Sequence, residues 1–151
     1  MIIIRDASEG DLSIIKFLED QAFINDAYDL EMLLTALLES KGMSIIAECD
    51  NIPAGYSIAI GMKDRKADIE SICVDPKFQG KGIGSMLLSA IEQKMRDRGF
   101  IESVLEVREF NRSAISMYEK AGYSVSRKLL NYYTGKLDGS RNALRMKKIL
   151  K

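Results

Sequence analysis

The stretch ICVDPKFQGKGIG, residues 72–84, decides how this chain folds. An apolar strand ends at Val74, Asp75 and Pro76 interrupt it, and a glycine-rich turn starts a helix at about Gly82. Glycines let the backbone approach a ligand closely, and the unpaired N–H groups of a helix's first turn donate to anions. The stretch therefore predicts a cradle for a pyrophosphate. The alternative interpretation is a strand-to-helix turn that binds nothing.

Two common phosphate-binding loops do not fit this turn. A Walker loop needs G-x-x-x-x-G-K-[ST], and the sequence contains no such string. A dinucleotide fingerprint needs a third glycine where Ser85 stands, and it belongs after the first strand of its unit, whereas about half of this chain precedes the turn. Neither loop accounts for the pattern Q-x-x-G-x-G that runs from Gln79 to Gly84.

Composition predicts one ordinary globular domain spanning residues 1–151, with 46% hydrophobic and 29% charged residues. The 22 basic and 22 acidic residues give a formal charge of zero, which does not favour a nucleic-acid or membrane partner. The apolar start, residues 1–4, is too short for a signal segment, and no run approaches a membrane span, so we expect a cytoplasmic protein.

The cysteine and histidine counts restrict the chemistry. The two cysteines, Cys49 and Cys73, form no C-x-x-C, and the sequence has no histidine, which argues against a zinc site and predicts a reduced protein that needs no metal. Any general base must then be a carboxylate, a lysine, a tyrosine or water. A covalent acyl-enzyme at Cys73 is disfavoured, because this thiol lies in an apolar strand with no cation nearby in sequence to lower its pKa.

Hydrophobic periodicity along the rest of the chain predicts an α+β fold. We expect a mixed, mostly antiparallel sheet of six to seven strands with helices on both faces, an α/β sandwich. The expected strands are residues 2–5, 43–49, 54–62, 67–74, 101–108, 123–129 and 143–150. The expected helices are residues 12–22, 30–41, 82–98 and 111–121, with a polar-aromatic loop at 23–29 and turns at 50–53 and 63–66.

Two further stretches are similar to a known family. Residues 105–123 fit the pattern L-E-V-R-x-x-N-x-x-A-x-x-x-Y-x-x-x-G-[FY], and the penultimate loop carries Asn-Tyr-Tyr at 131–133. Together with the turn at 79–84, they resemble the GNAT superfamily of N-acetyltransferases over nearly the whole chain. The paired tyrosines resemble the branch that acetylates protein N-termini, which includes ribosomal-protein alanine acetyltransferases and the catalytic subunits of N-terminal acetyltransferases.

This resemblance implies a reaction and three catalytic groups. Acetyl-CoA is the expected cofactor, and its acetyl group is expected to pass directly, in a ternary complex, to the free α-amine of a protein N-terminus. The family position implies that Glu106 is the base and that Tyr118 protonates or hydrogen-bonds the departing CoA thiolate. It also implies that the Val74 backbone N–H stabilises the negative oxygen. The residues alone leave two alternatives open. Glu106 would then be a solvated glutamate on a strand, and Tyr118 would be a tyrosine that only packs in the core.

The resemblance also implies the binding residues. The residues expected to contact the cofactor are Ile72, Cys73, Val74, Gln79, Gly80, Lys81, Gly82, Ile83, Gly84, Ser85, Asn111 and Tyr118. The residues expected to contact the substrate are Phe23, Tyr28, Glu106, Tyr132 and Tyr133, with edge-strand aromatics as the alternative for the last two. The chain departs from many relatives at Gly80, where they carry a basic residue, and its loop at 23–29 lacks their Leu-Pro-Glu-Asn string.

Two other functions stay open from the sequence. One is a GNAT enzyme that acts on a lysine or a small amine, which a wide, acidic acceptor cleft would favour over a narrow cleft walled by the paired tyrosines. The other is a non-catalytic acyl-CoA-binding subunit. The expected partner is a protein or peptide N-terminus, with ribosomal proteins and an auxiliary subunit as further candidates.

Overall fold

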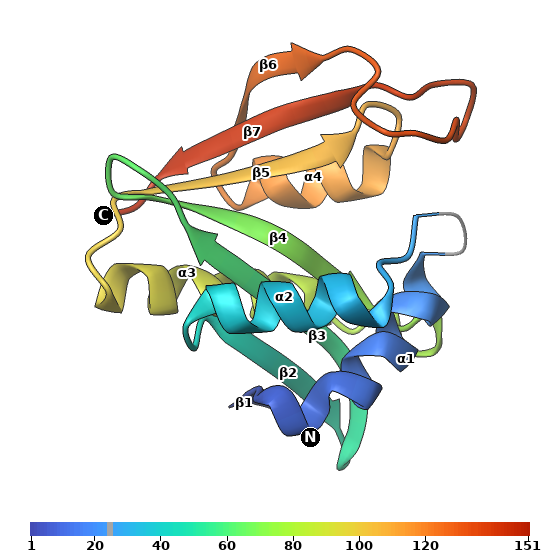
Figure 1. The fold of residues 1–151 in the computed structure, drawn as a ribbon, viewed down its shortest axis with the longest axis vertical. Coiled ribbons are helices and arrows are strands. Elements are labelled where there is room, and N and C mark those ends of the chain that lie inside the picture. Colours follow the sequence, from blue (N-terminus) through green and yellow to red (C-terminus); the bar gives the residue numbers. More distant parts are fainter. Residues whose placement is uncertain (24–25) are drawn as a thin grey trace.

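The computed structural model describes residues 1–23 and 26–151 and confirms the predicted α+β sandwich (Figure 1). Within these residues the strands are β1 (Ile2–Asp6), β2 (Ser44–Cys49), β3 (Ile52–Gly61), β4 (Lys66–Val74), β5 (Glu102–Arg108), β6 (Ser124–Leu129) and β7 (Ala143–Ile149). The helices are α1 (Leu12–Ala22), α2 (Leu30–Ser40), α3 (Ile83–Asp97) and α4 (Arg112–Lys120), with short 3₁₀ turns η1 (Glu9–Asp11) and η2 (Pro76–Phe78). The expected loop at 23–29 includes residues 24 and 25, which lie outside the described part.

The sheet is divided at its centre by one parallel pair of strands. Its strand order is β1-β2-β3-β4-β5-β7-β6, and β4 and β5 are parallel while the other neighbours are antiparallel. The β4–β5 pairing runs from Lys66 opposite Glu102 to Ile69 opposite Leu105 and then ends, although both strands continue. The two strands therefore separate toward their C-terminal ends, and this split positions the candidate site.

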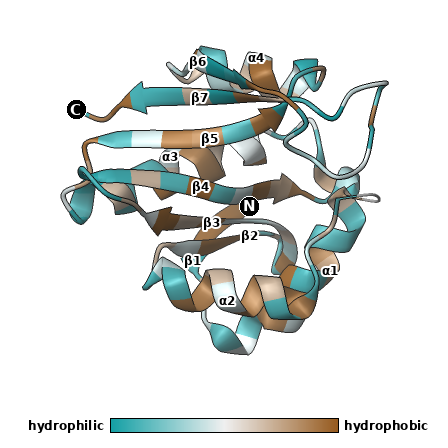
Figure 2. Ribbon diagram, turned by 45° about the horizontal axis from the view of Figure 1, so that its top comes forward, coloured by the Kyte–Doolittle hydropathy of each residue, from teal (hydrophilic) through white to brown (hydrophobic). Residues whose placement is uncertain are grey.

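The helices cover the two faces of the sheet in pairs. Helices α1 and α2 lie on one face and α3 and α4 on the other (Figure 1). On α3 the apolar residues Leu87, Leu88, Ile91 and Met95 recur at helical spacing, as expected, and all are almost fully buried against the sheet. Figure 2 shows the same pattern by colour, with hydrophobic residues on the central strands and on the helix sides that face them.

The turn between β2 and β3 is shorter than predicted. We expected a turn over residues 50–53, but Ile52 and Pro53 belong to β3. Asp50 and Asn51 have φ values of 51° and 69°, so both take the left-handed conformation of a two-residue hairpin turn. Aspartate and asparagine tolerate this conformation, and the chain can therefore reverse within two residues.

The predicted helix starts are confirmed by their capping contacts. The Ser8 backbone N–H donates to the Asp11 carboxylate at 3.0 Å, at the start of the segment that leads into α1. Asn111 Oδ1 accepts from the Ala114 backbone N–H at 3.3 Å and caps α4. Across the described ranges, we find no helix with both the length and the hydropathy to cross a membrane.

Candidate active site

The glycine-rich turn leaves open space at the start of α3. Gly80 and Gly82 have φ values of 82° and 78°, and a methyl group placed on either α-carbon would meet no described atom within 4 Å. Gly82 is the N-cap of α3 and offers no side chain to the amides of the first turn. The positive end of the helix dipole and these amide donors therefore suit an anionic group, such as the diphosphate of coenzyme A.

Gly84 has a packing reason to be glycine. A methyl group on its α-carbon would lie 3.0 Å from the Met117 sulfur of α4, closer than ordinary van der Waals contact. The small residue thus lets α3 approach α4 beneath the turn. The glycines of the Q-x-x-G-x-G pattern therefore have different structural roles.

The Val74 backbone N–H points into the split of the sheet. The next residue, Asp75, donates its N–H to the Ala54 carbonyl of β3 at 2.8 Å. Because successive N–H groups of a strand point to opposite sides, the Val74 N–H points toward β5. The β4–β5 pairing in the described chain has already ended at Ile69, so no β5 residue pairs with Val74.

Glu106 lies on the face of β5 opposite to α3 and α4. Its neighbours Leu105 and Val107 are buried in the core against these helices, as the alternation of the strand predicts. Glu106 pairs with Arg145 on β7, and its carboxylate accepts from Arg145 Nε at 3.0 Å. The Glu106 side chain is only 11% exposed, so this glutamate is held in place and is not the freely solvated strand residue of the alternative interpretation.

Two carboxyl groups on β4 lie beside Glu106. Asp68 is within hydrogen-bonding reach of Glu106. Glu70 is close enough to both residues to interact with them electrostatically. The pKa of Asp68 is raised well above its ordinary value, first by burial and then by the negative charge of Glu106 and by the contact with it. Burial, Glu106 and Glu39 of α2 raise the pKa of Glu70. Asp68, Glu70 and Glu106 therefore form a cluster of carboxyl groups where β4 and β5 separate.

Tyr118 is buried beneath the split, on the other face of the sheet. Its side chain is 6% exposed and packs edge-on against Tyr123, with ring centroids 5.9 Å apart. Burial raises its pKa above that of an ordinary phenol, and Tyr133 and Cys73 add to this effect. Tyr118 therefore belongs to the core on the α3–α4 face of the sheet.

Three tyrosines surround the carboxyl groups on the α1–α2 face. The rings of Tyr132 and Tyr133 meet edge-on at 5.0 Å, and the Tyr28 hydroxyl lies 3.5 Å from the Glu70 carbonyl. Burial raises the pKa of Tyr132, and the carboxylates of Glu106, Asp68 and Glu70 contribute. The paired tyrosines therefore lie near Glu106. A separate pocket of about 300 Å³ is lined by Tyr28, Glu70 and residues of α2.

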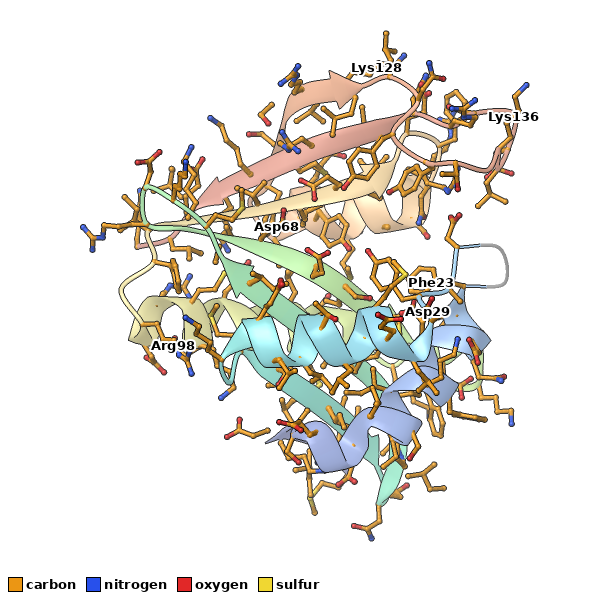
Figure 3. All side chains as sticks on the ribbon, in the orientation of Figure 1. Phe23, Asp29, Asp68, Arg98, Lys128 and Lys136 are labelled. Atoms are coloured by element: carbon orange, nitrogen blue, oxygen red, sulfur yellow. The ribbon has the colours of Figure 1, made fainter. Side chains whose placement is uncertain are left out.

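Two other expected residues, Phe23 and Cys73, pack in the core on the α1–α2 face of the sheet. Phe23 (labelled in Figure 3) is partly buried against the core under α1 and α2. The Cys73 thiol lies 3.8 Å from the Leu18 carbonyl of α1, and burial raises its pKa well above the ordinary value. The buried thiol thus agrees with the expectation that Cys73 forms no acyl-enzyme.

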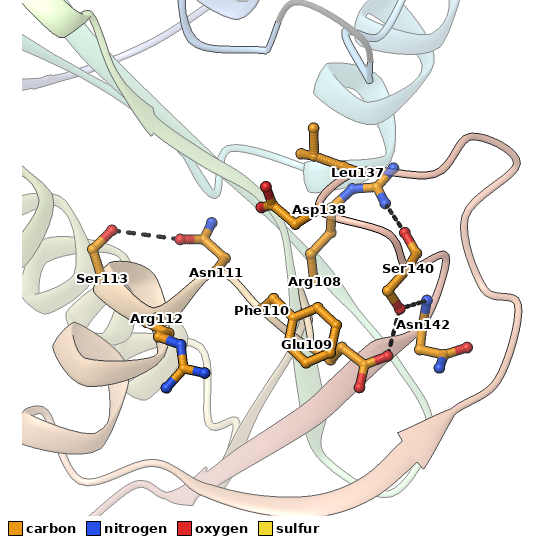
Figure 4. A pocket seen from close by; sticks show the side chains of 10 residues that line it. All are labelled: Arg108, Glu109, Phe110, Asn111, Arg112, Ser113, Leu137, Asp138, Ser140 and Asn142. Carbon is orange, nitrogen blue, oxygen red and sulfur yellow. Dashed lines mark hydrogen bonds between the residues drawn. The ribbon is translucent and has the colours of Figure 1, made fainter.

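Arg108, at the end of β5, joins the two loops that border the cleft. Its guanidinium forms a two-point ion pair with Asp26, at 2.6 and 2.7 Å, and donates to the carbonyls of Gly135 and Ser140. It also lies 4.1 Å from the centre of the Tyr133 ring. Figure 4 shows Arg108 beside a pocket of about 390 Å³ at the start of α4, which Asn111 also lines.

The fold and this arrangement together define the class of the N-acetyltransferases. The model of the acetyltransferase (GNAT) family matches residues 12–123, and the chain belongs to this family, whose enzymes use acetyl-CoA.

Individual relatives agree with this assignment. The ribosomal protein bS18-alanine N-acetyltransferase of Salmonella typhimurium is 37% identical over 84 residues, 56% of this chain and 56% of that protein. The chain therefore matches little more than half the length of this relative. N-alpha-acetyltransferase 20 of Dictyostelium discoideum is 31% identical over 137 residues, 85% of this chain and 75% of that protein. The structure of the ribosomal-protein-S18-alanine N-acetyltransferase from Escherichia coli superposes with a TM-score of 0.90 at 25% identity, covering 100% of this chain and 95% of that one.

Sequence reasoning missed Asp68, Glu70, Arg108 and Arg145 as residues of the cleft. A signal for the two acidic residues was present, because they stand at alternate positions of an otherwise apolar strand. The partners of Arg108 and Arg145 lie far away in the sequence, so only the strand pairing and the loop contacts identify these arginines.

Proposed function

We propose that this protein transfers the acetyl group of acetyl-CoA directly to the free α-amine of a protein N-terminus. The observation that carries the proposal is the position of Glu106 at the split of the sheet. Its carboxylate lies on the same face as Tyr28, Tyr132 and Tyr133, whereas Tyr118 lies on the opposite face. An acetyl donor that enters from one face of the sheet and an acceptor amine that enters from the other can therefore meet between β4 and β5.

On this proposal the turn after β4 holds the cofactor. The amides of the turn and of the first turn of α3, from Gln79 to Ser85, bind its diphosphate, and Lys81 adds a positive charge. The backbone of Ile72, Cys73 and Val74 and the side chain of Asn111 hold the pantetheine arm in the split. Bound acetyl-CoA supplies an activated thioester for attack by an amine.

The same proposal gives each catalytic group one task. Glu106 accepts a proton from the attacking amine, directly or through water; an α-amine has a pKa of about 8, so only modest base strength is required. The Val74 N–H, aimed into the split, stabilises the negative charge that develops on the acetyl oxygen. Tyr118, whose raised pKa keeps it protonated, donates its proton to the thiolate that leaves.

A specific observation favours a second candidate function, acetylation of a lysine side chain. The carboxyl groups of Glu70 on β4 and Glu106 on β5 lie close enough to interact, and such a pair is an environment that attracts an ammonium group. The paired tyrosines, whose rings meet edge-on at 5.0 Å, favour the first candidate, because on this proposal they wall the entrance for the acceptor. We propose ribosomal proteins as one class of substrate, since several relatives carry that name.

Mass spectrometry separates the two candidates in one reaction. A peptide with a free α-amine and one internal lysine is incubated with acetyl-CoA, and fragment ions locate the added group. A parallel reaction uses the same peptide with its α-amine blocked. We expect acetylation of the α-amine in the first reaction and none in the second. Acetylation of the lysine alone, in both reactions, would contradict the N-terminal assignment.

A further inference from the structure

Asp68 is a partly buried acidic residue to which the reaction above gives no task. It lies on β4 opposite Val104, just before β4 and β5 separate, and Figure 3 labels it there. Its Oδ1 atom is buried and has no hydrogen-bond donor among the described residues. An unpaired buried oxygen of this kind is costly unless another group shares a proton with it.

The neighbour of Asp68 is another acceptor. Its side chain is within hydrogen-bonding reach of Glu106, and two ionised carboxylates cannot form a hydrogen bond with each other. A contact between two carboxyl groups therefore requires one proton between them, as in other carboxyl pairs that share a site.

The surroundings indicate which member of the pair carries the proton. Arg145 of β7 donates to Glu106 at 3.0 Å and so favours the ionised form of that glutamate. Asp68 is partly buried, and the acidic groups near the pair are Glu70 of β4, Glu39 of α2 beyond it, and Tyr132 of the β6–β7 loop. Arg145, the cation that acts on Asp68, is already engaged by Glu106.

We propose that Asp68 is a positioning residue for Glu106, protonated at neutral pH and donating its proton in a hydrogen bond to the Glu106 carboxylate. Glu106 is then held between Asp68 on β4 and Arg145 on β7, ionised and fixed in orientation at the split of the sheet. This role rests on the proposed function of Glu106 as the base. In this proposal the carboxyl group of Asp68 keeps the carboxylate of Glu106 ionised and fixes its orientation.

Carbon NMR of protein labelled with ¹³C at the aspartate carboxyl groups tests the protonation state directly. The Asp68 signal is identified by its loss in Asp68→Asn. We expect it at the position of a protonated acid at neutral pH, with a titration midpoint several pH units above the ordinary aspartate value of about 3.9. In Glu106→Gln the midpoint should fall. The matched control, Glu70→Gln, removes a carboxylate two residues along β4 and should leave Asp68 protonated at neutral pH.

An ionised Asp68 at neutral pH in the wild type would overturn the proposal, and so would a midpoint that Glu106→Gln does not change. This measurement needs no turnover. It therefore decides the role of Asp68 even if the protein does not acetylate peptides, a result that would instead overturn the proposed function.

Kinetics supply the functional part of the test. Asp68→Ala removes the donor, and we expect kcat/KM for the peptide to fall about tenfold, a typical size for the loss of one hydrogen bond to a charged group. Asp68→Asn keeps an N–H donor at the same place and should recover most of that loss. Equal activity of the Ala and Asn variants, both folded by circular dichroism, would contradict a role through donation to Glu106.

Discussion

Tyr118 is a core residue to which the proposed reaction also gives a chemical task. Its ring is buried against Tyr123, and burial raises the pKa of its hydroxyl above the ordinary value of about 10. The phenol therefore stays protonated through the physiological range, as the proposed proton donation to the leaving thiolate requires.

Tyr118→Phe should lower kcat about 100-fold, because it removes the proposed acid and leaves the ring in place. The free energy of unfolding should change by no more than about 1 kcal/mol, since only a hydroxyl is lost. Steady-state kinetics and urea denaturation measure the two quantities. The matched control is Tyr123→Phe, which removes a hydroxyl bonded to Ser103 and Glu92. A loss of activity in the control as large as in Tyr118→Phe would argue against the acid role.

Asp68 makes the stability of the protein depend on pH in a predictable direction. Its pKa is raised from 3.8 in the folded state, first by burial. Between 3.8 and the raised pKa, the unfolded chain ionises while the folded chain holds its proton, so stability falls as the pH rises through this window. Below 3.8 both states are protonated and this contribution to stability is fully present.

We therefore expect Asp68→Asn to raise the melting temperature at neutral pH, because an amide cannot ionise and still donates to Glu106. The difference between the variant and the wild type should shrink as the pH approaches about 4. Differential scanning calorimetry at a series of pH values measures this difference. A difference that does not vary with pH would show that Asp68 is not protonated in the folded state.

At the scale of elements, Arg108 connects parts of the chain that are distant in sequence. It links the end of β5 to Asp26 before α2 and to the β6–β7 loop that carries Tyr133. The Arg108 side chain is 10% exposed and that of Asp26 28% exposed, so this ion pair is partly shielded from water. One side chain therefore connects Asp26 to the loop that carries Tyr133.

Arg108→Gln should raise KM for the peptide several-fold and cost about 1–3 kcal/mol of stability, since it leaves Asp26 without its partner. KM for acetyl-CoA should change much less, because the turn at residues 79–85 is not involved. Arg127→Gln, on the exposed face of β6, is the matched control. Equal increases in both KM values would mean that Arg108 supports the whole fold and not the acceptor cleft.

The contact between α3 and α4 depends on the absence of a side chain at Gly84. Gly84→Ala should destabilise the protein by about 1–3 kcal/mol, because its methyl group meets the Met117 sulfur. In the Met117→Ala background the same substitution should cost less, and urea denaturation of the four proteins measures the coupling. Gly10→Ala, where a methyl group makes only ordinary contact, is the control. Additive effects would contradict a direct contact.

The elements were largely predictable because their signals are local. The apolar spacing on α3 and the caps at Ser8 and Asn111 predicted helix positions that the structure confirms. The β2–β3 turn was misjudged, since Asp50 and Asn51 adopt left-handed conformations that no neighbouring glycine signals. The site was predictable only in part: the family patterns pointed to Glu106 and Tyr118, whereas Asp68 and Arg108 gain their importance from strand separation and loop contacts that depend on the whole fold.

At the scale of the whole molecule, cofactor binding should be visible as stabilisation. A ligand that binds only the folded state at 100 times its Kd adds about 2.7 kcal/mol, which raises the melting temperature of a protein of this size by several degrees. We expect this shift with coenzyme A and a much smaller one with pantetheine, which lacks the diphosphate that the glycine turn is proposed to bind. Equal shifts with both ligands would mean that the turn contributes little.

The most direct test of the account is a crystal structure of the protein with coenzyme A and a short peptide. We predict that the diphosphate lies on the amides of residues 79–85 and that the pantetheine arm enters the split beside Val74. The first nitrogen of the peptide should lie near Glu106, between the paired tyrosines and Tyr28. A cofactor bound away from the glycine turn, or a peptide that enters from the α3–α4 face, would contradict the account.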